Sequence, residues 1–461
     1  MSLNHVVILN WRDCDHPRAG GAELYCERVA AELVEQGVTV TLLAARVPGR
    51  PRVEMRDGFR VVRRGGALTV YPAALLWLRR HRREIDGVVD SQNGIPFFSP
   101  LALGRRVPVV LLIHHVHQRQ FRQYFRWPVS SLGRWLERRG TALVYRRRPI
   151  VTVSPSSRHA IRRQLGLAGP VFVAPCGTDP PATGDLVARA SSPRIVLVTR
   201  LVPHKRIELV LQALAQARRR VPNLDLHLVG DGPYRADVVR EVDRLGLRDC
   251  VVVHGRLGEK AKTDLLRTAW LTVSASAGEG WGLSLVEASA LGVPVVAVRV
   301  PGVQDAVRDG RTGLLVDHGS ELAPAVADLV ERLRDDAEAS RWGARANAWA
   351  TGFRWRRTAQ QIRLVLEASA SRAPGAADRR TASDVATVIE LTGAVPNLTD
   401  LRGATRRTDS WFRRGESVVG LLRDADEVDA LVVARRLGLL SRSDIQLRVS
   451  LARPQDLLRY A

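Results

Sequence analysis

The residues whose types and spacing best suit chemistry are two cations and two glutamates in the second half of the chain. Arg200 and Lys205 stand five residues apart in the segment RLVPHK. A guanidinium can hold a phosphate through two hydrogen bonds and an ammonium adds a compact charge, so this pair suits a diphosphate. Glu279 and Glu287 stand eight residues apart in EGWGLSLVE, and carboxylates accept paired hydrogen bonds from sugar hydroxyls. A solvated loop and a chance spacing are the plain alternatives.

Two further clusters in the first half of the chain suit ligand binding. Gly20-Gly21-Ala22-Glu23 opens a helical pattern, where paired glycines let a phosphate approach amides at the positive end of a helix. The cluster matches neither G-x-G-x-x-G nor the Walker A sequence, and an ordinary turn is the alternative. His114-His115-Val116-His117 lacks a typical zinc-ligand spacing. We therefore expect a histidine that contacts substrate, with structural roles open for the others.

Short apolar runs alternate with helical patterns along most of the chain. Strands are expected at 6–9, 38–44, 59–62, 87–90, 107–113, 150–153 and 171–174, and again at 195–199, 224–229, 251–254, 271–274, 293–298 and 313–316. These runs are continuously apolar, which indicates parallel strands covered on both faces. The fold class is therefore α/β, with two Rossmann-like domains in tandem. Ligands of such sheets bind at the carboxyl ends of strands, where all four clusters fall.

Composition shifts mark the domain boundaries. The first domain is predicted over residues 1–180 and the second over 190–370, with a Pro-, Gly- and Ala-rich join between them. Residues 371–384 are typical of a flexible linker. Residues 385–461 form an extension of unassigned role, in which 426–440 has a helical pattern.

Length and cysteine content exclude several classes of protein. The chain has 461 residues, 45% of them hydrophobic, which is enough to build two full cores. Its four cysteines lie far apart without a C-x-x-C pair, so a disulfide scaffold is not expected. No apolar run approaches the ~20 residues of a membrane span, and the first residues do not resemble a signal peptide. These features predict a cytoplasmic protein with reduced thiols.

Taken together, the motifs resemble those of the family 4 retaining glycosyltransferases with the GT-B fold. The matching segments are Gly20–Glu23, R-L-x-x-x-K at 200–205, VGDGP at 229–233, E-x7-E at 279–287, 298–302 and GRTGLLV at 310–316. The resemblance covers residues 4–370 and leaves out the extension. It implies two Rossmann-like domains that face a central cleft, with the acceptor bound by the first domain and the donor by the second.

The resemblance also implies roles for particular residues. His114, Arg200, Lys205 and Glu279 would be catalytic. The donor would be bound by Gly20, Gly21, Arg200, Lys205, Gly230, Arg256, Leu257, Glu279, Gly282, Leu283, Ser284 and Glu287. Where the family often has aspartate after its strand-end histidine, this chain has His115, which leaves open whether His114 or His115 contacts the sugar.

The chemistry implied is transfer of a hexosyl unit, with retention, from a nucleotide diphosphate sugar to an acceptor hydroxyl. GDP-mannose is the first choice of donor and a UDP-hexose the second. No metal or cofactor is expected, and we interpret Asp13-Cys14-Asp15 as a chance D-x-D. The alternatives are an enzyme that makes a soluble glycoside and a non-enzymatic membrane- or nucleic-acid-binding protein on the same fold.

A net charge of +23, almost all from arginine, points to an anionic partner. Residues 119–148 interleave nine arginines and six aromatic residues with a single acid, Glu137, and such a mixture is typical of an interfacial surface. The predicted membrane contacts are Arg119, Phe121, Arg122, Phe125, Arg126 and Trp127. A solvated helical face with inward aromatics is the alternative, and nucleic acid is not expected. The acceptor is accordingly predicted to be a glycolipid or lipid-linked saccharide on the inner face of the cell membrane.

Overall fold

The computed structural model describes residues 3–104, 106–146, 148–167, 170–179, 189–370, 386–406, 409–423, 425, 427–442 and 444–451. These residues form two compact units. Unit 1 comprises the described residues of 1–13, 26–174 and 359–461, and unit 2 those of 14–25 and 175–358. Within the described chain, no helix is both long enough and apolar enough to cross a membrane.

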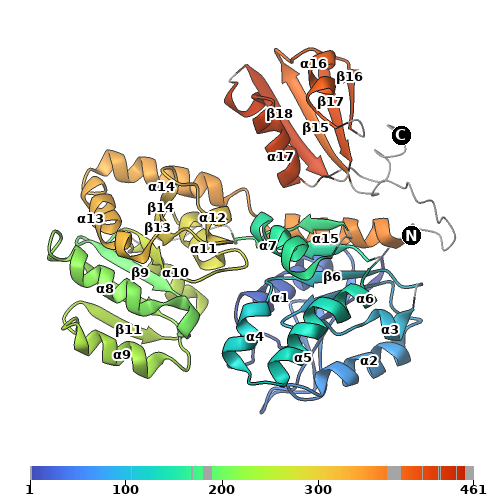
Figure 1. The fold of residues 1–461 in the computed structure, drawn as a ribbon, viewed down its shortest axis with the longest axis horizontal. Helices are drawn as coiled ribbons and strands as arrows, with labels where there is room; N and C mark the ends of the chain where they lie inside the picture. Colours follow the sequence, from blue (N-terminus) through green and yellow to red (C-terminus); the bar gives the residue numbers. More distant parts are fainter. Residues whose placement is uncertain are drawn as a thin grey trace. The chain divides into compact units, whose positions relative to one another are not determined.

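Unit 1 is built on an eight-stranded sheet in the order β3-β4-β2-β1-β5-β6-β7-β8 (Figure 1). Its strands are β1 (His5–Leu9), β2 (Thr39–Ala44), β3 (Val53–Arg56), β4 (Phe59–Arg63), β5 (Gly87–Gln92), β6 (Val109–Ile113), β7 (Ile150–Thr152) and β8 (Val171–Val173). All neighbours are parallel except the β3–β4 hairpin. The seven predicted strands are confirmed. β3 was not predicted because it is a half-exposed edge strand of sequence VEMR, without an apolar run.

The helices of unit 1 follow the strands of the sheet. They are α1 (Gly21–Glu35, whose first turn belongs to unit 2), α2 (Val70–His81), α3 (Pro100–Leu103), α4 (Gln118–Tyr124), α5 (Val129–Trp135), α6 (Thr141–Val144) and α7 (Pro155–Ala160), with π-helical turns η1 (Leu136–Gly140) and η2 (Ile161–Leu165). Apolar side chains of β1, β5 and β6 form the core with helix residues such as Ala74 and Leu78. This arrangement leaves the carboxyl ends of β1, β5 and β6 side by side.

Unit 2 contains two three-stranded parallel sheets in the orders β11-β10-β9 and β12-β13-β14. An isolated bridge between Ile195 and Leu271 joins them. The strands are β9 (Arg194–Val198), β10 (Asp225–Val229), β11 (Val251–Gly255), β12 (Thr272–Ser274), β13 (Val295–Val298) and β14 (Gly313–Val316), which confirms the six predicted strands.

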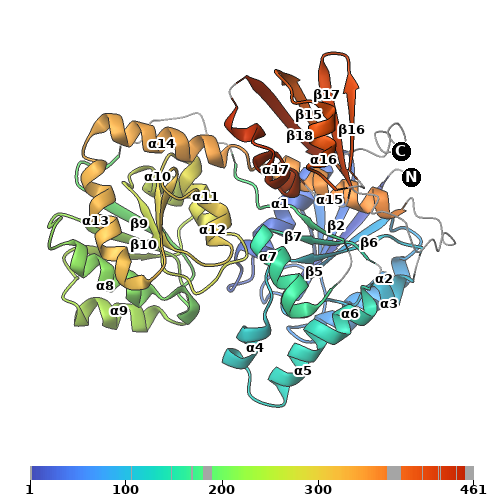
Figure 2. The same ribbon diagram turned by 45° about the horizontal axis from the view of Figure 1, so that its top comes forward.

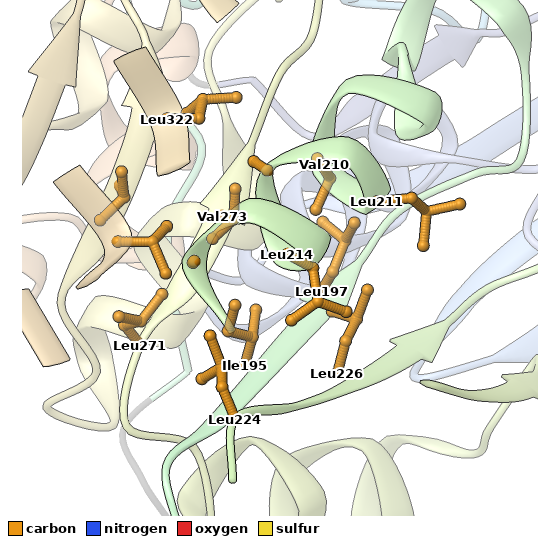
Figure 3. Packing of buried hydrophobic residues seen from close by; sticks show 14 of the residues in the cluster. Ile195, Leu197, Val210, Leu211, Leu214, Leu224, Leu226, Leu271, Val273 and Leu322 are labelled. Carbon is orange, nitrogen blue, oxygen red and sulfur yellow. The ribbon is translucent and has the colours of Figure 1, made fainter. Parts of the chain in front are cut away.

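The helices of unit 2 cover these strands. They are η3 (Pro203–Lys205), α8 (Ile207–Ala217), α9 (Arg235–Arg244), α10 (Glu259–Arg267), α11 (Leu283–Ala290), α12 (Val303–Ala306), η4 (Gly319–Glu321), α13 (Leu322–Arg332) and α14 (Asp336–Ala350). Val210, Leu211 and Leu214 of α8 belong to the same buried cluster as Leu197 and Leu226 of the sheet (Figure 3). Burial of this apolar face fixes the loops that leave the ends of β9 and β10.

The division of the chain differs from the predicted ranges in two places. Helix α15 (Trp355–Ala370) crosses between the units, and its part from Ala359 onward belongs to unit 1. There the Arg363 guanidinium donates a hydrogen bond to the carbonyl oxygen of Gln36 over 3.2 Å. The loop of residues 14–25, in contrast, belongs to unit 2. The predicted linker at 371–384 lies outside the described residues.

The extension forms an antiparallel sheet of its own within unit 1 (Figure 2). Its elements are β15 (Ala386–Gly393), α16 (Leu398–Gly403), β16 (Ser410–Arg414), β17 (Ser417–Arg423), α17 (Glu427–Arg436), η5 (Leu439–Ser441) and β18 (Ile445–Leu451). The sheet order is β16-β17-β15-β18, and the chain order βαββαβ is that of the ferredoxin-like fold. The predicted helix at 426–440 corresponds to α17 and η5, whereas the rest of this domain was not assigned.

Candidate active site

The Arg200–Lys205 loop follows β9 and is held by the loop that follows β10. The Leu201 amide donates to the carbonyl oxygen of Asp231 over 3.1 Å. Gly230 has a φ of +136°, and a Cβ added there would lie 1.8 Å from the carbonyl oxygen of Thr199. Gly230 therefore acts through its backbone, because only glycine lets the two strand ends approach this closely. The η3 turn then brings Lys205 to the end of the loop.

Lys205 forms an ion pair with Glu279, and the Glu279 carboxylate also accepts a hydrogen bond from the Ser276 hydroxyl over 2.7 Å. Both charged side chains are largely buried, at 14% and 21% exposure. Burial by itself raises the pKa of Glu279, but the Lys205 ammonium and the Ser276 hydroxyl outweigh it, and the pKa is lowered. The structure thus joins one predicted cation to one predicted carboxylate in a charged pair at neutral pH.

The segment after Glu279 leads directly into the N-terminus of α11. Gly282 precedes the helix as its N-cap residue with a φ of 108°, and as a glycine it has no side chain to cap the first turn. A Cβ on Gly302 would lie 2.3 Å from the carbonyl oxygen of Glu279, so the neighbouring loop also requires glycine there. Leu283 and Ser284 form the first turn and are half-buried. Uncapped helix amides of this kind form a favourable site for an anion.

Glu287 lies one turn further along α11 and is paired with Lys262 of α10. Lys262 Nζ lies 3.3 Å from the Glu287 carboxylate and 2.9 Å from that of Glu259. Burial raises the pKa of Glu287, and the Lys262 ammonium opposes this shift. The pKa of Lys262 is raised by the two carboxylates against the effect of burial. Lys262 was missed by the sequence analysis, although its being one of three lysines was an available signal.

The glycine-rich loop of residues 14–25 belongs to unit 2 and lies against Arg200 and the first turn of α11. A Cβ on Gly20 would lie 3.4 Å from Arg200 Nε, and one on Gly21 would lie 3.8 Å from the Leu283 side chain. Arg256, which follows β11, donates from Nη2 to the carbonyl oxygen of Pro17 over 2.7 Å. The structure therefore brings Gly20, Gly21 and Arg200 together beside the N-termini of α1 and α11.

His114 lies in unit 1 at the carboxyl end of β6, in a buried polar network. Its Nε2 lies 3.1 Å from the Ser91 hydroxyl, which in turn donates to Asn10 Oδ1 over 3.0 Å. Burial, together with the neighbouring His117, lowers the pKa of His114 to about 3. His114 is therefore a neutral imidazole near pH 7, available for hydrogen bonding and not as an acid.

The other two histidines of this cluster are arranged differently. The rings of His115 and His117 meet edge to face at 5.3 Å. The His117 amide donates to the buried carboxylate of Glu137 over 2.6 Å, and Gln118 Nε2 donates to the same group over 2.6 Å. Glu137 therefore anchors the loop between β6 and α4, a role that the sequence analysis did not assign.

Asp13 of the D-x-D sequence is buried against Arg63, whose Nε donates to its carboxylate over 2.5 Å. Both side chains are at most 1% exposed. Asp13 thus serves as the partner of a buried guanidinium. In the part of the chain that the structure describes, no group of three or more His, Cys, Asp or Glu side chains is arranged to hold a metal ion.

The arginine- and aromatic-rich stretch folds into the short helices α4, α5 and α6. Phe125 is 49% exposed, Trp127 is 81% exposed, and Arg122 and Arg126 are also exposed. Phe121 differs from the prediction: it is half-buried, and a Cβ on Gly133 would lie 2.5 Å from its ring. It therefore packs between α4 and α5. Arg119 lies in α4, but its side chain is not among those that the structure describes.

Further exposed apolar and basic side chains occur on the same unit. Val129, Leu132, Trp135 and Leu143 are each more than half exposed. At the end of α2, a hollow of about 320 Å³ is lined by four arginines: Arg79, Arg80, Arg82 and Arg83. Apolar groups beside uncompensated positive charge are typical of a surface that meets an anionic interface.

Comparison with known proteins shows the family of this chain. Residues 19–182 match the model described as Glycosyltransferase Family 4, and residues 184–349 match Glycosyl transferases group 1. The chain belongs to the family 4 glycosyltransferases. It is 29% identical, over 76% of its length and 95% of the relative's, to a GDP-mannose-dependent alpha-(1-6)-phosphatidylinositol monomannoside mannosyltransferase of Mycolicibacterium smegmatis.

A second relative of this glycosyltransferase is the alpha-D-kanosaminyltransferase of Streptomyces kanamyceticus, 26% identical over 68% of this chain and 90% of the relative. Among solved structures, the sucrose-phosphate synthase of Thermosynechococcus elongatus aligns with a TM-score of 0.65 and 21% identity, over 78% of this chain and 97% of that one. This likeness shows the GT-B fold, as predicted. The family models and the relatives in sequence show that the enzyme transfers a sugar.

Proposed function

We propose that this glycosyltransferase moves a mannosyl unit from GDP-mannose to a hydroxyl of a membrane glycolipid or lipid-linked saccharide, with retention of the anomeric configuration. The observation that carries the proposal is the cluster of unit 2, where the Lys205–Glu279 pair precedes the uncapped N-terminus of α11. The similarity to a GDP-mannose-dependent mannosyltransferase that acts on phosphatidylinositol monomannoside supports both the donor and the lipid acceptor. A UDP-hexose is the second choice of donor.

In this proposal the donor diphosphate is held by Arg200, Lys205 and the amides of two helix N-termini. Gly20 and Gly21 leave the room that a phosphate needs beside Arg200. The cations stabilise the negative charge that develops on the leaving diphosphate, which is the largest electrostatic contribution in such a transfer. Because the protein supplies this charge itself, we expect no metal requirement, and an assay with EDTA checks this expectation.

The remaining predicted residues orient the two ends of the donor. Glu287, held by Lys262, accepts hydrogen bonds from the ribose hydroxyls, and the base lies near Arg256 and Leu257. Glu279 contacts hydroxyls of the donor sugar, and releases Lys205 to the diphosphate when the donor binds. His114 receives a hydroxyl of the transferred sugar as a neutral imidazole. The acceptor attacks from the face that the leaving group occupies, with no protein nucleophile.

The acceptor is proposed to lie at a membrane surface. The exposed aromatic and arginine side chains of α4 to α6 and the four arginines at the end of α2 support an anionic inner leaflet as the partner. An enzyme that makes a soluble glycoside would ignore anionic vesicles. Sedimentation with vesicles that contain an anionic phospholipid, compared with neutral vesicles, separates the two cases.

The experiment that tests the donor is thermal unfolding in the presence of GDP, UDP or ADP. A nucleotide at 100 times its Kd stabilises the fold by about 2.7 kcal/mol. We expect GDP to raise the melting temperature of the wild type, and Arg200→Ala and Lys205→Ala to lose the shift. A shift by UDP alone would replace GDP-mannose by a UDP-hexose. If no nucleotide acts, with or without anionic vesicles, the proposed donor site is wrong.

A further inference from the structure

Arg206, which directly follows Lys205, has a backbone conformation that favours glycine. Its φ of 49° and ψ of 48° lie in the left-handed region, between the η3 turn and the start of α8. Among the described residues other than glycine, only Asp57 and Phe98 share a positive φ. Such a conformation is costly for a residue with a side chain, and it persists where the surroundings hold it. An arginine at this position therefore indicates a role for its side chain, which sequence analysis did not single out.

The Arg206 guanidinium holds residues 275–279, the loop that leaves β12 and ends at Glu279 (the Glu279 loop). Its Nε donates to the carbonyl oxygen of Ala275 over 2.7 Å, and its Nη2 donates to that of Ser276 over 2.9 Å. Ala275 and Ser276 are 1% and 3% exposed, and the carbonyl groups of buried residues need donors from the protein. A guanidinium offers two carbonyls donors in a fixed planar geometry, unlike the compact ammonium of lysine.

The Glu279 loop runs beside the loop that carries Lys205. The two loops follow β12 and β9, parallel strands that an isolated bridge joins, so they leave the sheet at the same edge. The Ala277 amide also donates to the carbonyl oxygen of His204 over 2.9 Å. The loops are thus linked at one end by the ion pair of Lys205 and Glu279, and at the other end by the backbone contacts of Arg206 and Ala277.

Donor binding affects these two links differently. In the proposed function, Lys205 turns from Glu279 to the diphosphate, which breaks the ion pair between the loops. The hydrogen bonds of Arg206 go to backbone carbonyls and involve neither of these side chains, so the movement of Lys205 leaves them intact. Glu279 contacts the donor sugar only while its loop stays in place.

We propose that Arg206 is a positioning residue for sugar recognition, which keeps the Glu279 loop in register with the Lys205 loop after the diphosphate has taken Lys205 from Glu279. The inference rests on the proposed function for the identity of the donor, whereas the hold of Arg206 on the loop does not. It divides donor binding into two parts. The diphosphate depends on Arg200 and Lys205, and the sugar depends on Arg206 through Glu279.

The first test measures hydrogen exchange of the Glu279 loop by mass spectrometry, in the full-length protein without ligand. Lys205→Met with Glu279→Gln removes the ion pair without leaving a buried charge, and it should speed exchange by less than about threefold, because Arg206 still holds the loop. Addition of Arg206→Gly should raise exchange by about tenfold or more, the size of one lost hydrogen bond to a charged group. Equal exchange in the two variants, whether fast or slow, would overturn the proposal. This measurement needs no activity.

The second test compares GDP, which lacks the sugar, with GDP-mannose. Arg206→Gly removes the guanidinium and fits the left-handed backbone without strain. We expect its affinity for GDP to stay within about twofold of the wild type, whereas kcat/KM for GDP-mannose falls about tenfold. Arg206→Lys should recover part of this loss, because an ammonium also donates to carbonyl oxygens. A parallel fall for GDP and GDP-mannose, or no fall for either, would overturn the proposal.

Arg218 provides the matched control, because its guanidinium holds a carbonyl at the opposite end of the sheet. Its Nη1 donates to the carbonyl oxygen of Leu224, directly before β10, over 2.7 Å. Arg218→Ala should lower the melting temperature but change neither the exchange of the Glu279 loop nor the preference between GDP and GDP-mannose. An equal change in Arg218→Ala and Arg206→Gly would mean a general loss of stability and would overturn the positioning role. If the wild type transfers no sugar, the proposed function is wrong, and hydrogen exchange still decides whether Arg206 holds the loop.

Discussion

The two units differ in whether their positive side chains face carboxylates. In the candidate site of unit 2, Lys205 faces Glu279 and Lys262 faces Glu287. In residues 119–148 of unit 1, nine arginines accompany the single acid Glu137, which is buried and occupied by the His117 amide and Gln118. Each paired charge has a partner that offsets part of its desolvation, and such a charge suits exchange onto one specific ligand. Uncompensated exposed charges create a field that attracts an extended anionic surface.

The largest expected effect concerns the paired lysine. Lys205→Ala should lower the rate of sugar transfer by about 10²–10³-fold, because it removes a charge aimed at the leaving group. Lys260→Ala is the matched control, since Lys260 is 91% exposed and pairs only at the surface with Asp264. It should change the rate by less than twofold in the same transfer assay. Similar losses in both variants would show that the enclosed pair has no special role.

The next effect concerns the exposed arginines of α4 and of the loop that follows it. A double variant, Arg122→Gln with Arg126→Gln, should bind anionic vesicles about 30-fold more weakly at low salt, at about 1 kcal/mol for each arginine. Its affinity for GDP should stay unchanged. The exposed arginines of unit 2 provide a control, Arg332→Gln with Arg334→Gln. If that control weakens vesicle binding as much, the attraction depends on net charge and not on this surface.

A pH dependence distinguishes the second pair of unit 2. The pKa of Glu287 is raised, so its carboxylate takes up a proton at a higher pH than usual as the solution is acidified. GDP affinity should therefore fall by about tenfold on acidification, as hydrogen bonds from the ribose to a charged acceptor are lost. Lys262→Ala removes the opposing charge and should move this loss to higher pH. Calorimetric titration of GDP across the pH range measures this shift, with Lys260→Ala on the same helix as the control. If the pH dependence of GDP affinity is the same in Lys262→Ala as in the wild type, the proposed role of the pair is contradicted.

The smallest effect is on acid stability. The pKa of Glu279 is lowered, so the Lys205–Glu279 pair stabilises the fold above the unfolded value near 4.5, and this stability is lost as the pH falls through the lower folded value. Between pH 7 and pH 3.5, the wild type should lose about 1 kcal/mol more stability than Glu279→Gln in urea unfolding. If the wild type and Glu279→Gln lose the same stability, the acid sensitivity of the fold does not come from Glu279.

Much of the fold was predictable because parallel strands covered on both faces must be continuously apolar. Most strands that escaped prediction lack this signature: β3 is a polar edge strand, and in β15 and β18 more buried and less buried residues alternate. β17 is the exception, because its residues 418–422 are all buried and it was still not assigned. Helix α17 could be predicted because its apolar residues recur at helical spacing. The boundaries between the units were harder to predict from the sequence. The loop of residues 14–25 belongs to unit 2 although it lies early in the chain, and the end of α15 belongs to unit 1 although it follows the strands of unit 2.

The sequence by itself determined the family, the α/β rhythm and the residue types of the donor motif, because spacing along one strand–loop–helix unit is a local property. Only the tertiary structure decided the partners: Lys205 with Glu279, 74 residues apart, and Ser91 with His114, 23 residues apart. It also showed that Phe121 packs inward, whereas Trp127 is exposed. Such pairings arise from the order of strands in a sheet and from close packing, which bring together residues that no local pattern relates.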